Sequence, residues 1–184
     1  MRRRTLIASA GAIVTVTTGR PTAAQTTDPE NTLYLDLKQG RVVIQMFPDL
    51  APLAVARIKQ LARQGFYDGT PFHRVIENFM AQGGDPTGTG TGGSQLDDIR
   101  AEFSDKAKFL RGTCGMARSQ SPNSANSQFF IMFEPASHLN GQYTIWGQVT
   151  EGMEFVDQLK RGSGGGTVSN PDKIEKFSVA ADAV

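Results

Sequence analysis

Two polar side chains, Arg74 and Gln82, lie in a stretch of sequence that is otherwise rich in aromatic and thioether residues. This stretch, residues 72–85, is followed about forty residues later by a second aromatic stretch at residues 127–131. Beside them we find no nucleophile paired with a base and no set of metal ligands. A cationic donor in apolar surroundings suits a substrate that is oriented and polarised rather than attacked. The predicted chemistry is therefore noncovalent.

A hairpin must bring Arg74 and Gln82 together, and its register depends on the turn between them. A two-residue turn would place the two side chains on opposite faces of the sheet. A three-residue loop ending at Asn78, with Asn78 in the left-handed region, would instead pair Arg74 with Met80. Arg74, Met80 and Gln82 would then share one face, while Phe79 would point the other way unless a bulge redirects it. The sequence permits both turns, and we adopt the second because asparagine tolerates the left-handed conformation.

Several of these residues also have a purely structural interpretation. Arg74 could be a surface strand residue whose aliphatic stem lies over apolar neighbours. Phe129 and Phe130 are consecutive, so one packs inward and the other faces outward, and alternation alone does not decide which. His73 is predicted to be structural, because strand alternation turns it away from Arg74.

The first 24 residues have the features of an export signal. The chain has 184 residues, near the size of one domain with a single sizeable core. Arg2, Arg3 and Arg4 precede an apolar run at residues 6–16, and small residues follow at 22–24. The run is too short and too rich in Ser, Gly and Thr to span a membrane. The paired arginines also permit a twin-arginine signal, and a disordered basic tail is the alternative.

We therefore divide the chain into an export signal at residues 1–24, a polar leader at 25–31 and one domain at 32–184. The mature protein is expected to be periplasmic or secreted, by the Sec or the twin-arginine route, without a membrane span and as a monomer. Removing residues 1–24 would leave 15 of the 19 Lys and Arg residues against 18 Asp and Glu, a net charge of −3. Such a mixed surface lacks the basic face that nucleic-acid binding requires.

Cysteine, histidine and glycine patterns limit the other kinds of site. Cys114 is the only cysteine, so an exported domain would have no internal disulfide. It lies in a strand-like run, where a buried thiol acts as a small apolar residue. One cysteine and two scattered histidines argue against a zinc site. Residues 83–93 are Gly-rich but lack the ending and the following helix of a phosphate-binding loop, so no cofactor is expected.

Short strands and two helices account for the pattern along the domain. Alternation at residues 33–37 and 42–47 predicts a hairpin. Residues 52–64 predict an amphipathic helix that begins with a proline and stops at a glycine, and residues 153–162 a second, shorter one. Many short strands with two helices indicate an antiparallel barrel or sandwich with helical caps. The remaining strands are expected at residues 72–76, 79–82, 113–117, 129–133, 143–149 and 174–180.

Five separate motifs occur in order along the predicted domain, at residues 72–85, 90–93, 115–117, 126–131 and 139–147. Together they resemble the cyclophilin family of peptidyl-prolyl cis–trans isomerases, and the resemblance extends from about residue 32 to residue 179. It implies a mainly β fold, a closed eight-stranded antiparallel β-barrel capped by two α-helices. It also implies an enzyme of the EC 5.2.1.8 type, which accelerates rotation about X–Pro bonds and would here assist the folding of exported proteins.

The resemblance assigns roles to individual positions. Arg74 matches the catalytic arginine, and Gln82 matches the glutamine that binds and steadies the substrate backbone. The apolar pocket for the proline ring and the groove around it are matched by Ile76, Phe79, Met80, Ala117, Gln128, Phe130, His138, Leu139 and Tyr143. The backbone of Arg118 matches the edge segment that holds the peptide in an extended form.

Three positions depart from the pattern that is common in the family. His138 stands where many eukaryotic relatives have a tryptophan that contributes to cyclosporin binding, so we expect weak cyclosporin binding. Tyr143 replaces a frequent histidine and Arg118 a frequent asparagine, and both changes resemble bacterial members. The expected partners are proline-containing polypeptides. The alternative function is a proline-peptide binding module or holding chaperone with incidental catalysis, although such a module would not need Arg74.

Overall fold

The computed structural model describes residues 28–183. The predicted export signal at residues 1–24 lies outside the described residues, as do residues 25–27 of the predicted leader. In the rest of the leader, the Asp28 carboxylate accepts a hydrogen bond from the Glu30 N–H at 3.0 Å and caps a short 3-10 helix, η1 (Pro29–Asn31). Among residues 28–183, no helix is both long enough and apolar enough to cross a membrane.

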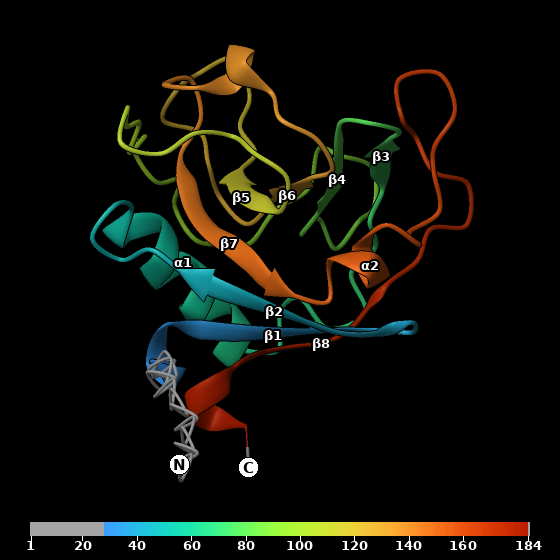
Figure 1. Cartoon of the computed structure of the whole chain (residues 1–184), viewed down its shortest axis with the longest axis horizontal. Helices are drawn as coiled ribbons and strands as arrows, with labels where there is room; N and C mark the ends of the chain where they lie inside the picture. Colours follow the sequence, from blue (N-terminus) through green and yellow to red (C-terminus); the bar gives the residue numbers. More distant parts are fainter. Residues whose placement is uncertain (1–27, 184) are drawn as a thin grey trace, which may run out of the picture.

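Eight antiparallel strands form one strongly curved sheet in the order β3-β4-β6-β5-β7-β2-β1-β8 (Figure 1). Along β1, the side chains of Leu33, Leu35 and Leu37 enter the core while their neighbours are more exposed or lie at its edge, as the alternation predicts. The strands are β1 (Thr32–Leu37), β2 (Gly40–Met46), β3 (Arg74–Ile76), β4 (Met80–Gly83), β5 (Thr113–Met116), β6 (Phe129–Met132), β7 (Ile145–Glu151) and β8 (Ile174–Val179).

The expectation of a closed barrel is wrong, because the ladder of strands stays open between β3 and β8. The segments that precede these two strands meet through separate backbone hydrogen bonds, such as Phe72 N–H to Asp172 O at 2.9 Å. Pro71, in the segment before β3, lies opposite Lys173, in the segment before β8. A proline has no N–H to contribute to a ladder of backbone hydrogen bonds. The sheet is therefore a curled half-barrel.

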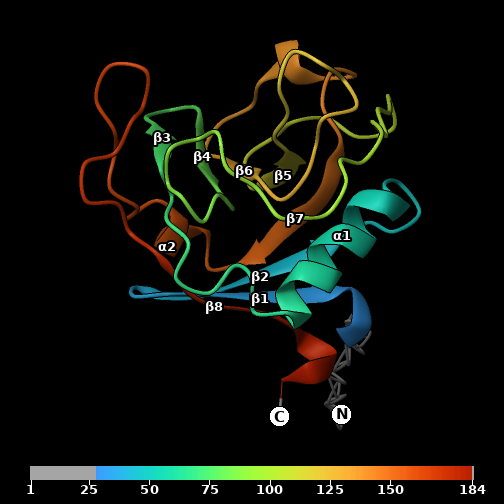
Figure 2. The same ribbon diagram turned by 180° about the vertical axis from the view of Figure 1, so that it is seen from behind.

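Two α-helices pack around the sheet (Figures 1 and 2). α1 (Pro52–Arg63) buries Val55, Ile58 and Leu61 along one face, as predicted. The N–H groups of its first turn donate to the Glu102 carboxylate, from Leu53 and from Ala54, each at 2.9 Å. A negative charge at this end of a helix is favourable.

The second helix, α2 (Met153–Val156), is shorter than the sequence predicts. Beyond it the hydrogen bonds change to a three-residue spacing, with Leu159 N–H donating to Val156 O at 3.1 Å. Leu159 is nevertheless buried, so the apolar spacing reflects burial rather than helix. Two further 3-10 turns are η2 (Ser137–Leu139) and η3 (Ala180–Asp182).

The buried side chains form two clusters. In the larger one, the rings of Tyr67, Phe129, Trp146 and Phe177 meet at centroid distances between 4.9 and 6.0 Å. Cys114 belongs to this cluster, and burial raises the pKa of its thiol, which suits a small apolar core residue. The smaller cluster supports the candidate site and consists of Met80, Phe109, Phe130, Met132, Ala136, Leu139 and Ile145.

Candidate active site

The hairpin of β3 and β4 places Arg74 directly opposite Gln82, with both side chains on one face. Asn78 has a φ of 57°, the left-handed conformation that the sequence predicts. The predicted register is wrong by two residues, since Ile76 rather than Arg74 pairs with Met80. The loop begins one residue later than expected and contains Phe79, which therefore escapes strand alternation without a bulge.

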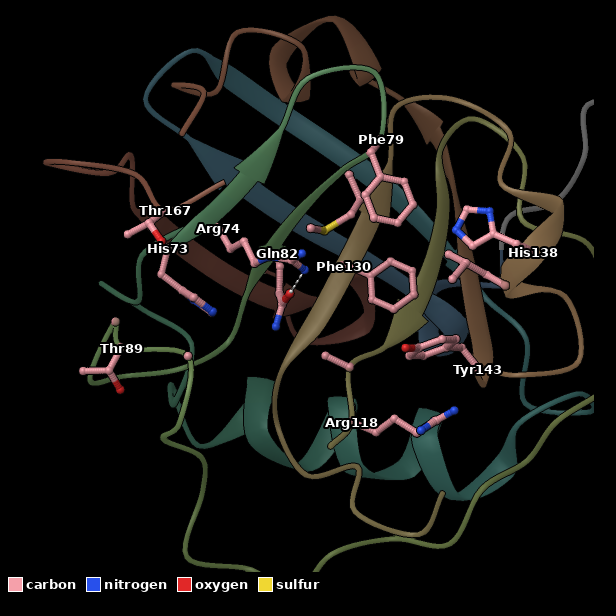
Figure 3. Close-up of a pocket in the computed structure, with 15 residues that line it drawn as sticks. His73, Arg74, Phe79, Gln82, Thr89, Arg118, Phe130, His138, Tyr143 and Thr167 are labelled. Carbon is pink, nitrogen blue, oxygen red and sulfur yellow. Dashed lines mark hydrogen bonds between the residues drawn. The ribbon is translucent and has the colours of Figure 1, made fainter. Parts of the chain in front are cut away.

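A cavity of about 530 Å³ opens over this hairpin (Figure 3). Ten of the twelve residues singled out in the sequence line it, and the other two are Ile76 and Gln128. A second cavity of about 550 Å³ adjoins the first and shares Gln82, Gly90, Ala117 and Arg118 with it. The first cavity is lined by His73, Arg74, Phe79, Met80, Gln82, Gly88, Thr89, Gly90, Ala117, Arg118, Phe130, His138, Leu139, Tyr143 and Thr167.

A chain of hydrogen bonds fixes the polar side of the cavity. Arg74 donates from Nε to Gly165 O at 3.0 Å and from Nη1 to Gln82 Oε1 at 3.3 Å. Gln82 donates in turn from Nε2 to Gln128 Oε1 at 2.8 Å. Gln128 donates to the carbonyls of Gly90 and Gly92, at 3.0 and 2.8 Å. Gln128 thus lines the second cavity and supports the first through Gln82.

Aromatic rings form the opposite wall of the cavity. Phe130 stacks on Phe109 at 5.5 Å and meets the edge of Tyr143 at 5.7 Å, and Phe79 stacks on His138 at 5.8 Å. Phe130 faces this cavity while Phe129 points into the core, which settles the alternation that the sequence left open. A side chain at Gly115 would overlap the Phe130 ring, so a glycine in β5 makes room for it.

Arg118 lies at the rim, between the two cavities. Its guanidinium carbon is 4.5 Å from the centroid of the Tyr143 ring, and its Nη2 donates to Gln142 O at 3.0 Å. Of the described residues, Asp98 is the one acidic residue that lines either cavity. The site therefore combines an apolar floor, a fixed arginine and a cationic rim.

The family model described as "Cyclophilin type peptidyl-prolyl cis-trans isomerase/CLD" matches residues 32–179. The chain belongs to the cyclophilin family. A probable peptidyl-prolyl cis-trans isomerase of Brucella suis biovar 1 is 52% identical to it over 187 residues, which cover 95% of each chain. Peptidyl-prolyl cis-trans isomerase B of Bacillus subtilis is 41% identical over 130 residues, covering 70% of this chain and 90% of the relative. The protein is thus a cyclophilin-type peptidyl-prolyl cis–trans isomerase, EC 5.2.1.8.

Solved cyclophilins share the fold. A cyclophilin-type isomerase of Cryptosporidium parvum, crystallised in the presence of the dipeptide Ala-Pro, superposes with a TM-score of 0.74 at 30% identity. The superposition covers 80% of this chain and 98% of that one. The cyclophilin AquaCyp293 of Hirschia baltica gives a TM-score of 0.77 at 27% identity, over 86% and 77% of the two chains.

Five residues line the first cavity of this cyclophilin without having been singled out as candidates in the sequence. Gly88, Thr89 and Gly90 belong to the Gly-rich loop at residues 83–93. Its many glycines were a visible signal of an unusual backbone, and Gly88 and Gly90 do have positive φ. Thr167 comes from a loop about eighty residues further along the chain, and no sequence pattern points to it. His73 precedes β3, so strand alternation does not turn it away from the cavity edge.

His73 is nevertheless buried, with only 6% of its surface exposed. Within residues 28–183 neither of its ring nitrogens has a hydrogen-bond partner. Burial lowers the pKa of the imidazole, although the nearby Asp85 carboxylate opposes this effect. Burial of His73 therefore favours the neutral imidazole.

Asp85 anchors the Gly-rich loop from inside. Its fully buried carboxylate accepts hydrogen bonds from the N–H groups of Thr87, Gly90 and Gly92, at 2.8, 2.7 and 3.1 Å, and from the Thr87 hydroxyl at 2.8 Å. Burial raises the pKa of this carboxyl, but the hydrogen bonds together bring it below its ordinary value. The loop is thus held in place as one wall of both cavities.

Ile76 does not reach either cavity, contrary to the resemblance. It is half-buried at the end of β3, packs on the cluster below the site and lies against Gly166. In the part of the chain that the structure describes, no group of three or more His, Cys, Asp or Glu side chains is placed to hold a metal ion.

Proposed function

We propose that this cyclophilin isomerises X–Pro bonds in exported polypeptides and that Arg74 catalyses the rotation. The observation that supports this role is the setting of the Arg74 guanidinium on the polar wall of a cavity whose opposite wall is aromatic. It is held by two neutral acceptors, Gly165 O and Gln82 Oε1. Among residues 28–183, Arg74 forms no salt bridge. Its charge is therefore available to a substrate.

The chemistry of the X–Pro bond explains why a fixed cation suffices. The bond is planar through resonance, with a rotation barrier of about 18–20 kcal/mol. As the bond twists, the proline nitrogen regains its lone pair and becomes a better hydrogen-bond acceptor. A guanidinium N–H directed at this nitrogen stabilises the twisted state more than the planar one, which is the condition for catalysis. No covalent intermediate is needed.

The energy required is within reach of one charged donor together with positioning. A turnover on the order of a thousand per second corresponds to a barrier of about 13 kcal/mol. The site must then supply about 5–7 kcal/mol relative to the uncatalysed rotation. Electrostatic stabilisation in a water-excluded site contributes about 3–4 kcal/mol per donor, and orientation of the substrate supplies the remainder.

The other lining residues divide between the proline ring and the peptide backbone. We assign the ring to the apolar pocket of Phe79, Met80, Phe130 and Leu139. Gln82 has its amide at the boundary of the two cavities, where it can bind the backbone of the substrate. The segment of Ala117 and Arg118 would hold the chain extended along the rim.

Substitution of Arg74 tests the assignment. In a protease-coupled assay on an X–Pro peptide, Arg74→Ala is expected to lower kcat at least about a hundredfold with little change in KM. Arg41→Ala is the control, since Arg41 pairs with Asp36 on the β1–β2 hairpin. Unchanged turnover in Arg74→Ala would refute the catalytic role. A variant that loses isomerisation but keeps its effect in the cell would show that binding, rather than catalysis, is the cellular function.

The export hypothesis rests on residues 1–24 and is tested separately. We expect the periplasmic or secreted fraction to contain a chain that begins near residue 25. N-terminal sequencing of the protein from separated cell fractions measures this directly. An uncleaved chain recovered with the membrane would show that the segment is kept as an anchor.

A further inference from the structure

A glycine-rich loop, residues 162–167, covers the outer edge of β3, the strand that begins with Arg74 (Figure 1). Val75 N–H donates to Gly166 O at 2.8 Å, and Gly162 N–H donates to Val75 O at 2.9 Å. Arg74 itself pairs with Thr167 in an isolated bridge. The loop therefore runs alongside the arginine as a short additional strand would.

The same loop also contacts the arginine side chain. Arg74 Nε donates to Gly165 O at 3.0 Å, and Gln82 Oε1 accepts from Nη1 on the other side. Two acceptors on different nitrogens fix both the direction and the plane of a guanidinium. The third nitrogen of the guanidinium, Nη2, makes no hydrogen bond to the described residues. It belongs to a side chain that lines the cavity.

Gly166 sets the distance between the loop and Arg74. It has a φ of +95° and is buried, unlike its exposed neighbours at residues 163–165. A Cβ atom at this position would overlap the Ile76 side chain and would lie 3.2 Å from Arg74 Cγ. Only a glycine allows the loop to lie this close to the arginine stem.

We propose that Gly166 is a positioning residue for Arg74, and that the loop at residues 162–167 preorganises the guanidinium before the substrate binds. This inference rests on the proposed catalytic role of Arg74. A long side chain that is already held in one rotamer loses no further conformational entropy when the transition state forms. The loop thereby contributes to turnover although it makes no contact with the proline.

A purely structural role for the loop makes a different prediction. Covering the open edge of β3 protects unpaired backbone groups, and its loss would lower stability. It would leave turnover by the remaining folded molecules unchanged. The distinction therefore requires kinetic constants per folded molecule rather than total activity.

The test compares Gly166→Ala with Gly164→Ala. Both glycines have positive φ, +95° and +57°, but a Cβ at Gly164 meets nothing within 4 Å. Gly166→Ala is expected to lower kcat about tenfold with KM unchanged, because displacing a positioned group by about 1 Å costs up to a hundredfold. Gly164→Ala is expected to stay within about twofold of the wild type. Equal kcat in the two variants, each normalised to folded protein, would overturn the proposal.

A second measurement needs no substitution in the loop. In ¹⁵N-labelled wild-type protein, the Arg74 Nε–H signal, assigned by its loss in Arg74→Lys, is expected to exchange with water more slowly than that of the exposed Arg100. Equal exchange rates would show that the bond to Gly165 O does not hold the guanidinium. This result does not depend on turnover, so it separates failure of the positioning role from failure of the catalytic assignment.

Discussion

Arg118 places a charge beside the site without blocking it. The guanidinium lies on the Tyr143 ring and donates to main-chain carbonyls, so its position is fixed but its charge is not neutralised. A cation at the junction of the two cavities favours substrates with an acidic side chain next to the proline. The resemblance to the family gives this position only a backbone role, and from the placement of the guanidinium we expect an additional role of the side chain.

A peptide series measures this preference. We expect kcat/KM for a Glu–Pro peptide to exceed that for the Lys–Pro peptide about threefold to fivefold, the effect of a partly exposed ion pair. Arg118→Gln should bring the ratio close to one, and added salt should reduce it in the wild type. Arg41→Gln, which removes a distant surface charge, serves as the control. A ratio that is the same in Arg118→Gln and the wild type would contradict the prediction.

His138 determines the expected response to cyclosporin. The imidazole stacks on Phe79 at the cavity wall. The resemblance to the family matches this position to the tryptophan that contributes to cyclosporin binding in many eukaryotic relatives. The smaller ring offers less apolar surface, so we expect inhibition no stronger than micromolar. His138→Trp should tighten inhibition about tenfold in the peptide assay, since about 1.4 kcal/mol of added contact suffices. Nanomolar inhibition of the unmodified protein would show that this position does not limit affinity.

At the scale of an element, the loop from Asp85 to Gly92 depends on one buried carboxylate. Its backbone turns with positive φ at Gly88 and Gly90, and the N–H groups point inward to Asp85. The carbonyls of Gly90 and Gly92 point the other way and accept from Gln128. Loss of the carboxylate would therefore disturb the chain of hydrogen bonds that ends at Arg74.

Asp85→Asn keeps one acceptor oxygen and replaces the other by an NH2 group, which cannot accept a hydrogen bond. We expect the free energy of unfolding to fall by about 2–3 kcal/mol, the cost of unpaired hydrogen bonds to a buried charge. We also expect kcat/KM to fall several-fold, as Gln128 and Gln82 lose their fixed positions. Chemical denaturation and the peptide assay measure the two effects, with the exposed Asp105→Asn as the control. Wild-type stability in Asp85→Asn would show that the carboxylate is not the anchor.

Strands and helices whose apolar residues recur at a regular spacing could be predicted from the sequence, but the loops that connect them could not. Alternation of leucines marked β1, and the spacing of Val55, Ile58 and Leu61 marked α1, since burial imposes those periods. The predicted hairpin register was wrong because moving a three-residue loop by one position changes every strand partner by two residues, and Asn78 could fit in the loop at either position. The approach of residues 162–167 to Arg74 had no signal, because glycine has no side chain to carry a pattern.

At the scale of the whole molecule, the two histidines differ in a way that links stability to pH. His73 is buried and His138 is exposed. The charged groups that influence His73 are Asp85, which favours the protonated imidazole, and Arg74, which opposes it. Burial outweighs both, so the pKa of His73 lies below its ordinary value of 6.5 in the folded state. The unfolded chain therefore binds a proton at a higher pH than the folded protein does.

Stability is consequently expected to be fully present above pH 6.5 and to fall as the pH drops from there towards the lowered pKa of His73. One such group changes the free energy of unfolding by at most about 1.4 kcal/mol per pH unit. The pKa of Asp85 is also lowered, but from 3.8, so its contribution is lost only in more acidic solution. His73→Phe should flatten the dependence between pH 6.5 and 5. Denaturant midpoints at several pH values measure these slopes, and equal slopes in His73→Phe and the wild type would mean that another group senses the acid.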